Sequence, residues 1–501
     1  MKGALAAVIL AYAFAPAVSG QAERGRLNKL NVVALDARGQ PVTGLNSADF
    51  QLFQDGKRED IAFFRFTGGW AIQSRPSPGE YSNRAVPAWH ATAILIDLLT
   101  NRLMSDSIIG REVADSLKSL ESGEGLYLYI LTPNGELYPV HPLPQPDTAA
   151  TPAPEPWTRD VSALMQAAIR KLVGIRPVDD EDIKFRLDLT SKALRDLGAQ
   201  MAGISGRKNL VWVTHGIPIA GFSISMQTGL DFTNPIRWFC ERLAEAQIVV
   251  YPVEQSLAGA AAGSPSIQTL QEFANITGGR EYSSGLADKA IQQALTDSRA
   301  NYEIAYYSAV KTDRKHHKIR VACRRKEVRL HTQEGFYALE PLVSPGALAA
   351  SELQSRGLPM EIETAAHSPF DATGIGLRVR VSPDPVDAHT RRFDVHIHAA
   401  DLLPRLTREP DAGKVFVAFV AFDESRKPLP HPILVTLTPE QFAAPTRGEI
   451  GFREAIPVPQ GIRKVRVIVF DAALGAVGSV AIPLSAVTGQ LAPRPECIRA
   501  A

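Results

Sequence analysis

Residues Thr92–Asp97 read T-A-I-L-I-D, a continuous apolar run that ends in a single carboxylate. A run of this length without polar alternation is typical of a strand buried on both faces, as in a parallel sheet. A charge at the carboxyl end of such a strand would lie in the crevice where open α/β sheets bind ligands. Alternatively, Asp97 only caps the loop or helix that follows it.

Strand-like runs alternate with helical periodicity over residues 88–308. The strand-like runs are 92–97, 126–132, 209–214 and 247–252. The helical runs are 105–120, 161–173, 188–203, 235–246, 264–277 and 287–300. Such alternation implies right-handed crossovers and a mainly parallel sheet covered on both faces. This part of the chain therefore predicts a doubly wound α/β domain.

The segments on either side of this domain have β patterning. Residues 27–67 alternate apolar and polar positions and contain Asp55-Gly56, a strong two-residue hairpin signal. Residues 362–483 contain about seven short strand-like runs separated by turn residues, which is typical of an immunoglobulin-like sandwich. The expected fold class is multidomain, with a central doubly wound, mainly parallel sheet flanked by two β-sandwich-like domains.

Composition places the expected boundaries between these parts. Residues 68–87 are rich in Gly, Ser and Pro, as linkers are. The expected order is a signal peptide (1–20), a small β module (27–67), a linker (68–87), the α/β domain (88–308), a β extension (309–338), a connector (339–361), the immunoglobulin-like sandwich (362–483) and a tail (484–501).

The first twenty residues resemble an export signal. Lys2 precedes the apolar run 4–15, which is too short to span a bilayer comfortably, and Ala15-Pro16-Ala17 fits an A-x-A cleavage site. A retained N-terminal anchor helix is the alternative. If the signal is removed, we expect a mature chain outside the cytoplasm, periplasmic or secreted, with no transmembrane segment.

Charge and cysteine content narrow the expected partners. The 501 residues carry a formal net charge of +1, so nucleic acid or an anionic membrane is not expected as the main partner. Cys240, Cys323 and Cys497 are far apart and odd in number, which predicts neither a metal cluster nor a disulfide framework. One disulfide stays possible, and the oligomeric state is left open.

Two motifs carry a family resemblance. Residues 206–216 (G-R-K-N-L-V-W-V-T-H-G), together with T-A-I-L-I-D, resemble a von Willebrand factor A domain. Residues 41–57 (P-V-T-G-L-N-S-A-D-F-Q-L-F-Q-D-G-K) resemble the short β module that begins exported chains in a bacterial branch of that family. The segment from H-K-I-R-V (317–321) through E-G-F-Y-A (334–338) resembles its closing strands. The resemblance covers roughly residues 27–338 and implies protein binding at the carboxyl edge of the sheet.

The resemblance also implies a place for a divalent ion. Family members hold it with an Asp in D-x-S-x-S, a Thr from a later loop and a second Asp. Here Asp97 matches the first position, Leu99 and Asn101 replace the serines, Thr190 matches the Thr, and His215 replaces the second Asp. Leu99 cannot ligate, so the implied site is degenerate and holds Mg²⁺ or Mn²⁺ weakly or not at all. Alternatively the ion site has decayed and these residues are caps and loop.

The sequence gives only weak evidence for a catalytic site. Asp97 and His215 could face each other across the crevice, with Ser105, Thr132 or Thr214 as the nucleophile. The sequence has no strained G-x-S-x-G turn and no phosphate-binding loop. We therefore expect an exported adhesion or protein-interaction protein and not an enzyme. The alternatives are an extracytoplasmic hydrolase that uses Asp97 and His215, and a purely structural envelope component.

Overall fold

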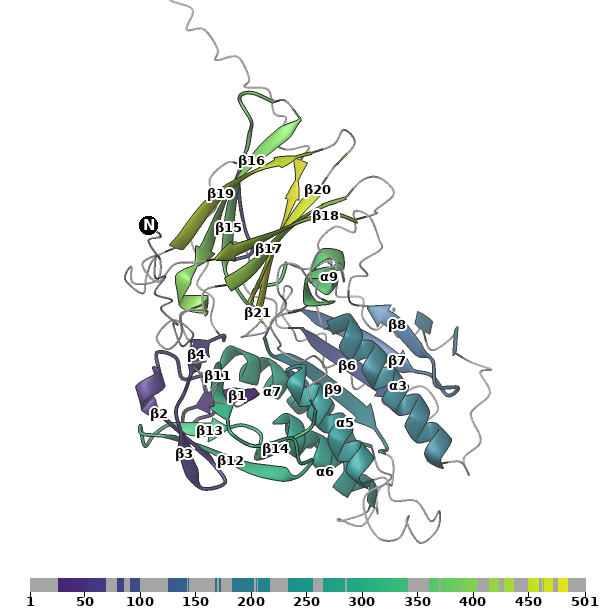
Figure 1. Ribbon diagram of the computed structural model, residues 1–501. Helices are drawn as coiled ribbons and strands as arrows, with labels where there is room; N and C mark the ends of the chain where they lie inside the picture. Colours follow the sequence, from purple (N-terminus) through teal and green to yellow (C-terminus); the bar gives the residue numbers. More distant parts are fainter. Residues whose placement is uncertain are drawn as a thin grey trace, which may run out of the picture.

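A computed structural model gives the architecture of most of the chain (Figure 1). It describes residues 26–68, 79–84, 91–99, 125–141, 143, 167–168, 171–172, 183–201, 204, 206–216, 233–255, 265–283, 286–340, 360–368, 371–387, 389–402, 414–422, 428–436, 449–458, 462, 464–471 and 476–484. The expected signal peptide and the helix expected at residues 105–120 lie outside these ranges.

Strands dominate the described part of the chain. They form four four-stranded sheets, each antiparallel throughout, and one five-stranded mixed sheet. The expectation of a central doubly wound, mainly parallel sheet is therefore wrong. Periodicity detects that a strand is buried, but it does not say which strand pairs with it or in which direction.

The mixed sheet has the strand order β10-β9-β6-β7-β8. Strands β6 (Thr92–Asp97), β7 (Leu126–Leu131), β9 (Lys208–Thr214) and β10 (Ile248–Glu254) are mutually parallel, and β8 (Leu137–His141) runs antiparallel to β7. The reversal has a local cause. Gly135 takes φ 85° in a tight turn after β7, and so short a connection can join only antiparallel strands.

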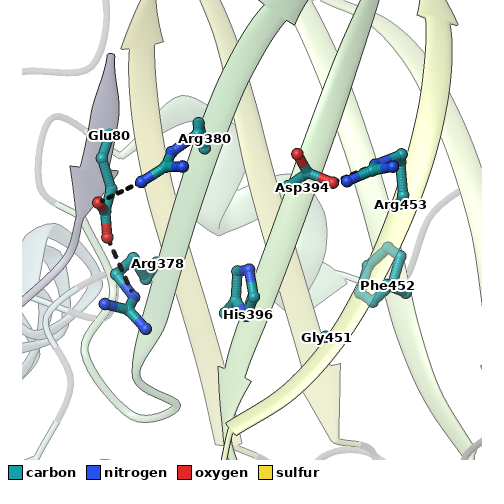
Figure 2. Close-up of a pocket in the computed structure, with 8 residues that line it drawn as sticks. All are labelled: Glu80, Arg378, Arg380, Asp394, His396, Gly451, Phe452 and Arg453. Atoms are coloured by element: carbon teal, nitrogen blue, oxygen red, sulfur yellow. Dashed lines mark hydrogen bonds and ion pairs between the residues drawn. The ribbon is translucent and has the colours of Figure 1, made fainter. Parts of the chain in front are cut away.

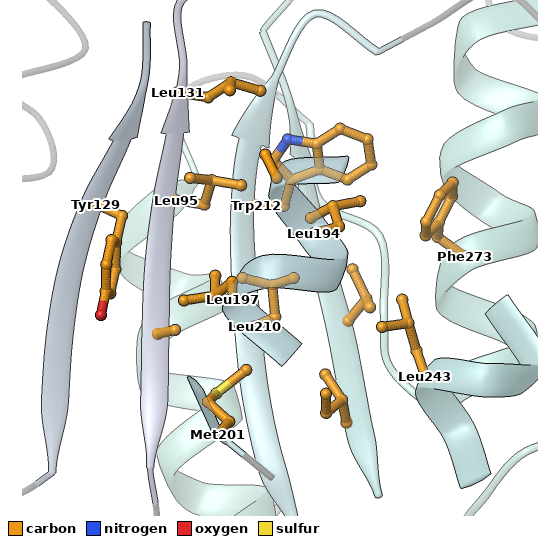
Figure 3. Packing of buried hydrophobic residues seen from close by; sticks show 14 of the residues in the cluster. Leu95, Tyr129, Leu131, Leu194, Leu197, Met201, Leu210, Trp212, Leu243 and Phe273 are labelled. Carbon is orange, nitrogen blue, oxygen red and sulfur yellow. The ribbon is translucent and has the colours of Figure 1, made fainter. Parts of the chain in front are cut away.

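Helices contact both faces of the mixed sheet. On one face lie α3 (Ile183–Met201), α5 (Thr233–Glu245) and α6 (Pro265–Thr277), whose apolar side chains surround Trp212 (Figure 3). On the other face lies α7 (Ala287–Arg299). Every residue of the four parallel strands is buried, as the unbroken apolar runs predict for strands covered on both sides.

The N-terminal β residues form a sandwich with residues that follow α7. One sheet contains β1 (Arg26–Leu35), β4 (Phe63–Phe66), β11 (Asn301–Ser308) and β13 (Arg329–His331). The facing sheet contains β2 (Phe50–Gln54), β3 (Lys57–Glu59), β12 (His316–Cys323) and β14 (Gly335–Tyr337), with the short helix η1 (Ser47–Asp49) before β2. Residues 27–67 and 309–338 thus share one hydrophobic core, because a few short strands cannot bury an apolar face alone.

The C-terminal β residues form a second sandwich. One sheet contains β5 (Glu80–Ser82), β15 (Leu377–Pro383), β16 (Thr390–His398) and β19 (Glu449–Pro457), with η2 (Ala399–Asp401) after β16. The other contains β17 (Lys414–Phe422), β18 (Pro428–Thr436), β20 (Lys464–Asp471) and β21 (Ala476–Pro483), and α9 (Met360–His367) packs on it. This arrangement is loosely compatible with the expected immunoglobulin-like sandwich.

Residues 79–84, part of the expected linker, are built into that second sandwich. The Asn83 side chain is buried and donates to the carbonyl oxygens of Ala372 and Ile375 at 2.7 and 2.8 Å. Its carbonyl oxygen accepts the Leu377 N–H at 2.8 Å. One amide therefore satisfies three backbone groups more than 280 residues away and fixes β5 beside β15.

A buried charge network joins the two sandwiches. Arg65 of β4 pairs with Glu303 of β11 and donates to the Gly374 carbonyl oxygen. Arg84 pairs with Asp401, whose carboxylate also accepts the Gly376 N–H at 2.7 Å. Burial raises the pKa of Asp401, but hydrogen bonds and the charges of Arg84 and Arg65 lower it by more, so the net shift is downward.

None of the helices in the described ranges has the length and hydropathy that crossing a bilayer requires.

We predict that Asn83→Ala lowers the free energy of unfolding by about 2 kcal/mol, since the Ile375 carbonyl and the Leu377 N–H lose their partner, while the Ala372 carbonyl keeps the Ser479 N–H. Urea unfolding of the full chain measures this loss. Gln40→Ala, which removes an exposed amide in a distant turn, is the control and should leave the midpoint unchanged. Equal midpoints for Asn83→Ala and wild type would contradict the role given to Asn83.

Glu241 of α5 links the helical layer to the N-terminal sandwich. Its carboxylate accepts the Tyr337 N–H of β14 at 2.8 Å, and its side chain is 3% exposed. Burial raises its pKa to about 7, with Glu245 adding to the rise and the Tyr337 hydrogen bond opposing it. Because the folded pKa lies above the unfolded value, stability from this group is complete below pH 4.5 and is lost as pH rises through 7.

We predict that Glu241→Gln gains stability over wild type as pH rises from 5 to 8, by up to about 3 kcal/mol, because the variant avoids burying a charge and can still accept the Tyr337 N–H. Urea unfolding of both proteins at the two pH values measures the difference. Glu327→Gln, at an exposed site, should show no such dependence. A gain that is the same at pH 5 and pH 8 would refute the assignment.

Candidate functional site

Asp97, Thr214 and Glu254 are the last residues of β6, β9 and β10. The parallel register pairs Thr214 with Glu254 and Ile96 with Val213, so the three side chains meet at the carboxyl edge of the mixed sheet. The sequence predicted Asp97 and the loop after Thr214 at such an edge. It gave no sign of Glu254, because a strand-terminal Glu carries no motif of its own.

Asp97 is fully buried and acts as an internal hydrogen-bond acceptor. Its Oδ1 accepts the Leu99 N–H at 3.0 Å. Its Oδ2 accepts the Thr214 hydroxyl at 2.7 Å and the Trp212 indole N–H at 3.2 Å. With 0% exposure, the carboxylate ties the end of β6 to the end of β9 and has no surface to offer a partner.

His215 lies half-buried beside this cluster. Burial lowers its pKa, and the negative charges of Asp97 and Glu254 only partly oppose that effect. The imidazole is therefore mainly neutral at pH 7. A neutral imidazole can accept a proton or ligate a soft metal, but it adds no charge to the edge.

The described donors do not fit a hard divalent ion. Both Asp97 oxygens are engaged, and the Leu99 side chain is in the core. The Thr190 hydroxyl is buried without a hydrogen-bond partner, so it is not bonded to Asp97, and Asn101 lies outside the described residues. Mg²⁺ and Mn²⁺ need several oxygen ligands. In the described ranges, no group of three or more His, Cys, Asp or Glu is placed to hold a metal.

The residues considered for hydrolysis are also committed to structure. Thr214 is 1% exposed, gives its hydroxyl proton to Asp97 and accepts the Gly216 N–H at 3.0 Å. The Thr132 hydroxyl accepts the Glu136 N–H at 2.8 Å inside the β7–β8 turn. Ser105 lies outside the described residues. Since a substrate must reach its nucleophile, hydroxyls buried to this degree do not make a catalytic site as they stand.

A hollow of about 610 Å³ lies elsewhere, on the outer face of the sheet β19-β16-β15-β5. Figure 2 shows its side chains, which come from all four strands. They are Glu80, Arg378, Arg380, Asp394, His396, Gly451, Phe452 and Arg453. Most of them are the outward members of the strand alternation, while the residues between them pack in the core.

Opposite charges alternate across the four strands. In register, Glu80 is opposite Arg380, Arg380 is opposite Asp394, and Asp394 is opposite Arg453. Ion pairs join Arg380 to Glu80 at 3.4 Å and Arg453 to Asp394. Directly opposed unlike charges stabilise a sheet by a few tenths of a kcal/mol to about 1 kcal/mol each.

The floor of the hollow depends on a glycine. Gly451 is opposite His396, and a Cβ there would approach His396 Nδ1 to 3.2 Å. A strand glycine often marks close approach by another group. Sequence reasoning missed this site, although the alternations R-x-R, D-x-H and G-x-R (378–380, 394–396 and 451–453) were visible. Only the strand register shows that these residues lie side by side, and the sequence assigned Glu80 to a linker and not to a strand.

Comparisons with known proteins add little to this geometry. No family model matches the sequence, and no curated protein matches it. Among solved structures, the chain is similar to a point mutant of the PilB minor pilin from Streptococcus sanguinis. The identity is 13%, the TM-score is 0.24, and the match covers 56% of this chain and 90% of that chain. A TM-score this low carries no argument, and the resemblance to von Willebrand factor A domains stays a prediction from the sequence.

We predict that Asp97→Ala destabilises the protein by about 3 kcal/mol or more, because it removes the carboxylate that accepts from three buried donors. Thr190→Val is the matched control: it removes a buried hydroxyl that has no partner, so its stability should equal or exceed that of wild type. Urea unfolding of the two variants tests both statements. An Asp97→Ala variant as stable as wild type would contradict the structural role given to this carboxylate.

Proposed function

We propose that this protein binds a protein partner through the hollow on the sheet β19-β16-β15-β5 and does not turn over a substrate. The observation that carries the proposal is the exposure of the guanidinium groups at this hollow. The side chains of Arg378, Arg380 and Arg453 are 44%, 58% and 68% exposed. Arginine is enriched at protein interfaces and at their energetic centres.

The hollow is a better candidate than the carboxyl edge of the mixed sheet. At that edge Asp97 and Thr214 are buried and bonded to each other, so a partner could reach them only by opening the fold. At the hollow, the three arginine side chains already face solvent on a sheet that is packed beneath by a continuous apolar core. A rigid support of this kind lets side chains bind without a large ordering cost.

The lining favours a macromolecule over a small metabolite. Sites for small molecules enclose most of the ligand and place only a few polar groups around it. Here six of the eight lining residues are charged or histidine, and Phe452 is the one large apolar side chain among them. The charged groups spread over four strands, which matches the extended footprint of a protein and not that of one small ligand.

The first twenty residues support a location outside the cytoplasm for this interaction, as an adhesion or envelope protein would have. The hydrolase alternative gains no support from the buried hydroxyls near Asp97. A purely structural component would not depend on the exposed arginines of the hollow, so substitution of those residues separates the two possibilities.

We predict that the double variant Arg380→Glu/Arg453→Glu loses at least about tenfold in capture of a partner, because it reverses charges that contact the partner. The assay is chemical cross-linking in the source cell extract, with quantitative mass spectrometry of the captured proteins. The control Arg38→Glu/Arg58→Glu makes the same charge change at exposed sites of the N-terminal sandwich. Capture that is identical for wild type, control and hollow variant would reject the proposal.

A further inference from the structure

We infer that the hollow recognises an acidic segment of the partner, whose carboxylates bind Arg380 and Arg453. This inference rests on the proposed function and names the chemistry of its ligand. Its basis is the difference between hydrogen-bond donors and acceptors in the hollow. The arginine donors exceed the partners that the described residues supply, whereas the carboxylates of the hollow keep few oxygens without a partner.

The three arginines differ in how far they are committed. Arg378 is held at both ends, with Nε 3.1 Å from Glu80 Oε1 and Nη2 paired with Glu449. Arg380 has one long contact, from Nη2 to Glu80 Oε2 at 3.4 Å. Arg453 uses Nε for Asp394. In the described part of the chain the other nitrogens of Arg380 and Arg453 have no hydrogen-bond partner.

The carboxylates in and beside the hollow leave fewer atoms free for a ligand than the arginines do. Glu80 is 7% exposed on its side chain, and each of its oxygens pairs with an arginine. Glu449 pairs with Arg378 and lies 3.6 Å from His396 Nδ1. Asp394 pairs with Arg453 through Oδ1, and its Oδ2 has no hydrogen-bond partner in the described part of the chain. An incoming cation finds at most a single carboxylate oxygen beside a paired arginine, while an incoming carboxylate finds open guanidinium edges that suit bidentate binding.

The geometry suits a peptide with neighbouring acidic residues. Arg380 and Arg453 share one cross-strand row with Asp394 between them, as Figure 2 shows. Two strand spacings separate their backbones by about 10 Å, which an extended peptide covers in about three residues. Below this row the His396 ring lies against Gly451, so a side chain at position 451 would crowd the floor of the hollow. An acidic segment can therefore contact both arginines from one side.

The charge balance argues against a nucleic acid as the ligand. Three arginines face three carboxylates at and beside the hollow, and the whole chain has a net charge of +1. Nucleic-acid sites carry a clear excess of positive charge, because phosphates dominate their affinity. A balanced patch with a few open guanidinium groups favours short-range recognition of individual carboxylates.

The test is fluorescence anisotropy of a labelled deca-glutamate peptide with the full chain. We expect Arg380→Ala/Arg453→Ala to bind at least about tenfold more weakly, given the strength of charge-assisted hydrogen bonds. Gly451→Val, which fills the floor without changing charge, should also weaken binding. The control Arg38→Ala/Arg58→Ala should bind as wild type does. Urea unfolding verifies that each variant is folded.

The outcomes separate this inference from the proposed function. Equal peptide binding by wild type and the double alanine variant would overturn the inference. So would a deca-lysine peptide, a single-stranded DNA oligonucleotide or inorganic phosphate that binds as tightly as deca-glutamate. In each of those cases a loss of partner capture by Arg380→Glu/Arg453→Glu still supports the proposed function. Peptide binding that needs both arginines, with capture unchanged, would support the acidic-ligand site and reject the proposed function.

Discussion

The placement of β5 is the constraint on which the candidate binding surface depends. Residues 79–84 lie nearly 300 positions before β15 in the chain, yet they complete its sheet through β5. Asn83 satisfies three backbone groups there, and Arg84 reaches Asp401 in a buried ion pair. Because β5 carries Glu80, the same anchoring positions the carboxylate that holds Arg378 and Arg380. The contacts that hold β5 in its sheet therefore also position the charged residues of the hollow.

Two charged clusters in this protein have opposite physical characters. At the carboxyl edge of the mixed sheet, Asp97 is buried and its oxygens are matched by donors from the protein itself. A carboxylate in that setting stabilises the fold, since burial without partners would be costly. At the hollow, Arg380 and Arg453 are exposed and only partly paired. Because these guanidinium groups are exposed and only partly paired, they can form further hydrogen bonds with a ligand.

The fold was only partly predictable from the sequence. Strands at 92–97 and 209–214 follow from apolar runs, and the hairpin at Asp55-Gly56 follows from its turn residues. The antiparallel β8 follows from the turn residues Pro133-Asn134-Gly135 in the same way. The fold class was not predictable, because most of the strands pair in antiparallel sheets with distant partners, as β11 does with β1. For the candidate site, Asp97 was found as a strand-terminal acid, but its burial depends on Trp212 and Thr214, which only tertiary contacts bring to it.

The sequence by itself determined the local features: which segments are apolar enough to be buried, where turns occur, and which residue types carry charge. These follow from side-chain chemistry within a few residues. Only the tertiary structure decided which strands pair, that Asp97 is internal, and that Glu80 joins Arg380, Asp394 and Arg453 in one row. Pairing between distant strands depends on the burial of apolar area shared by segments hundreds of residues apart, and no local pattern encodes that choice.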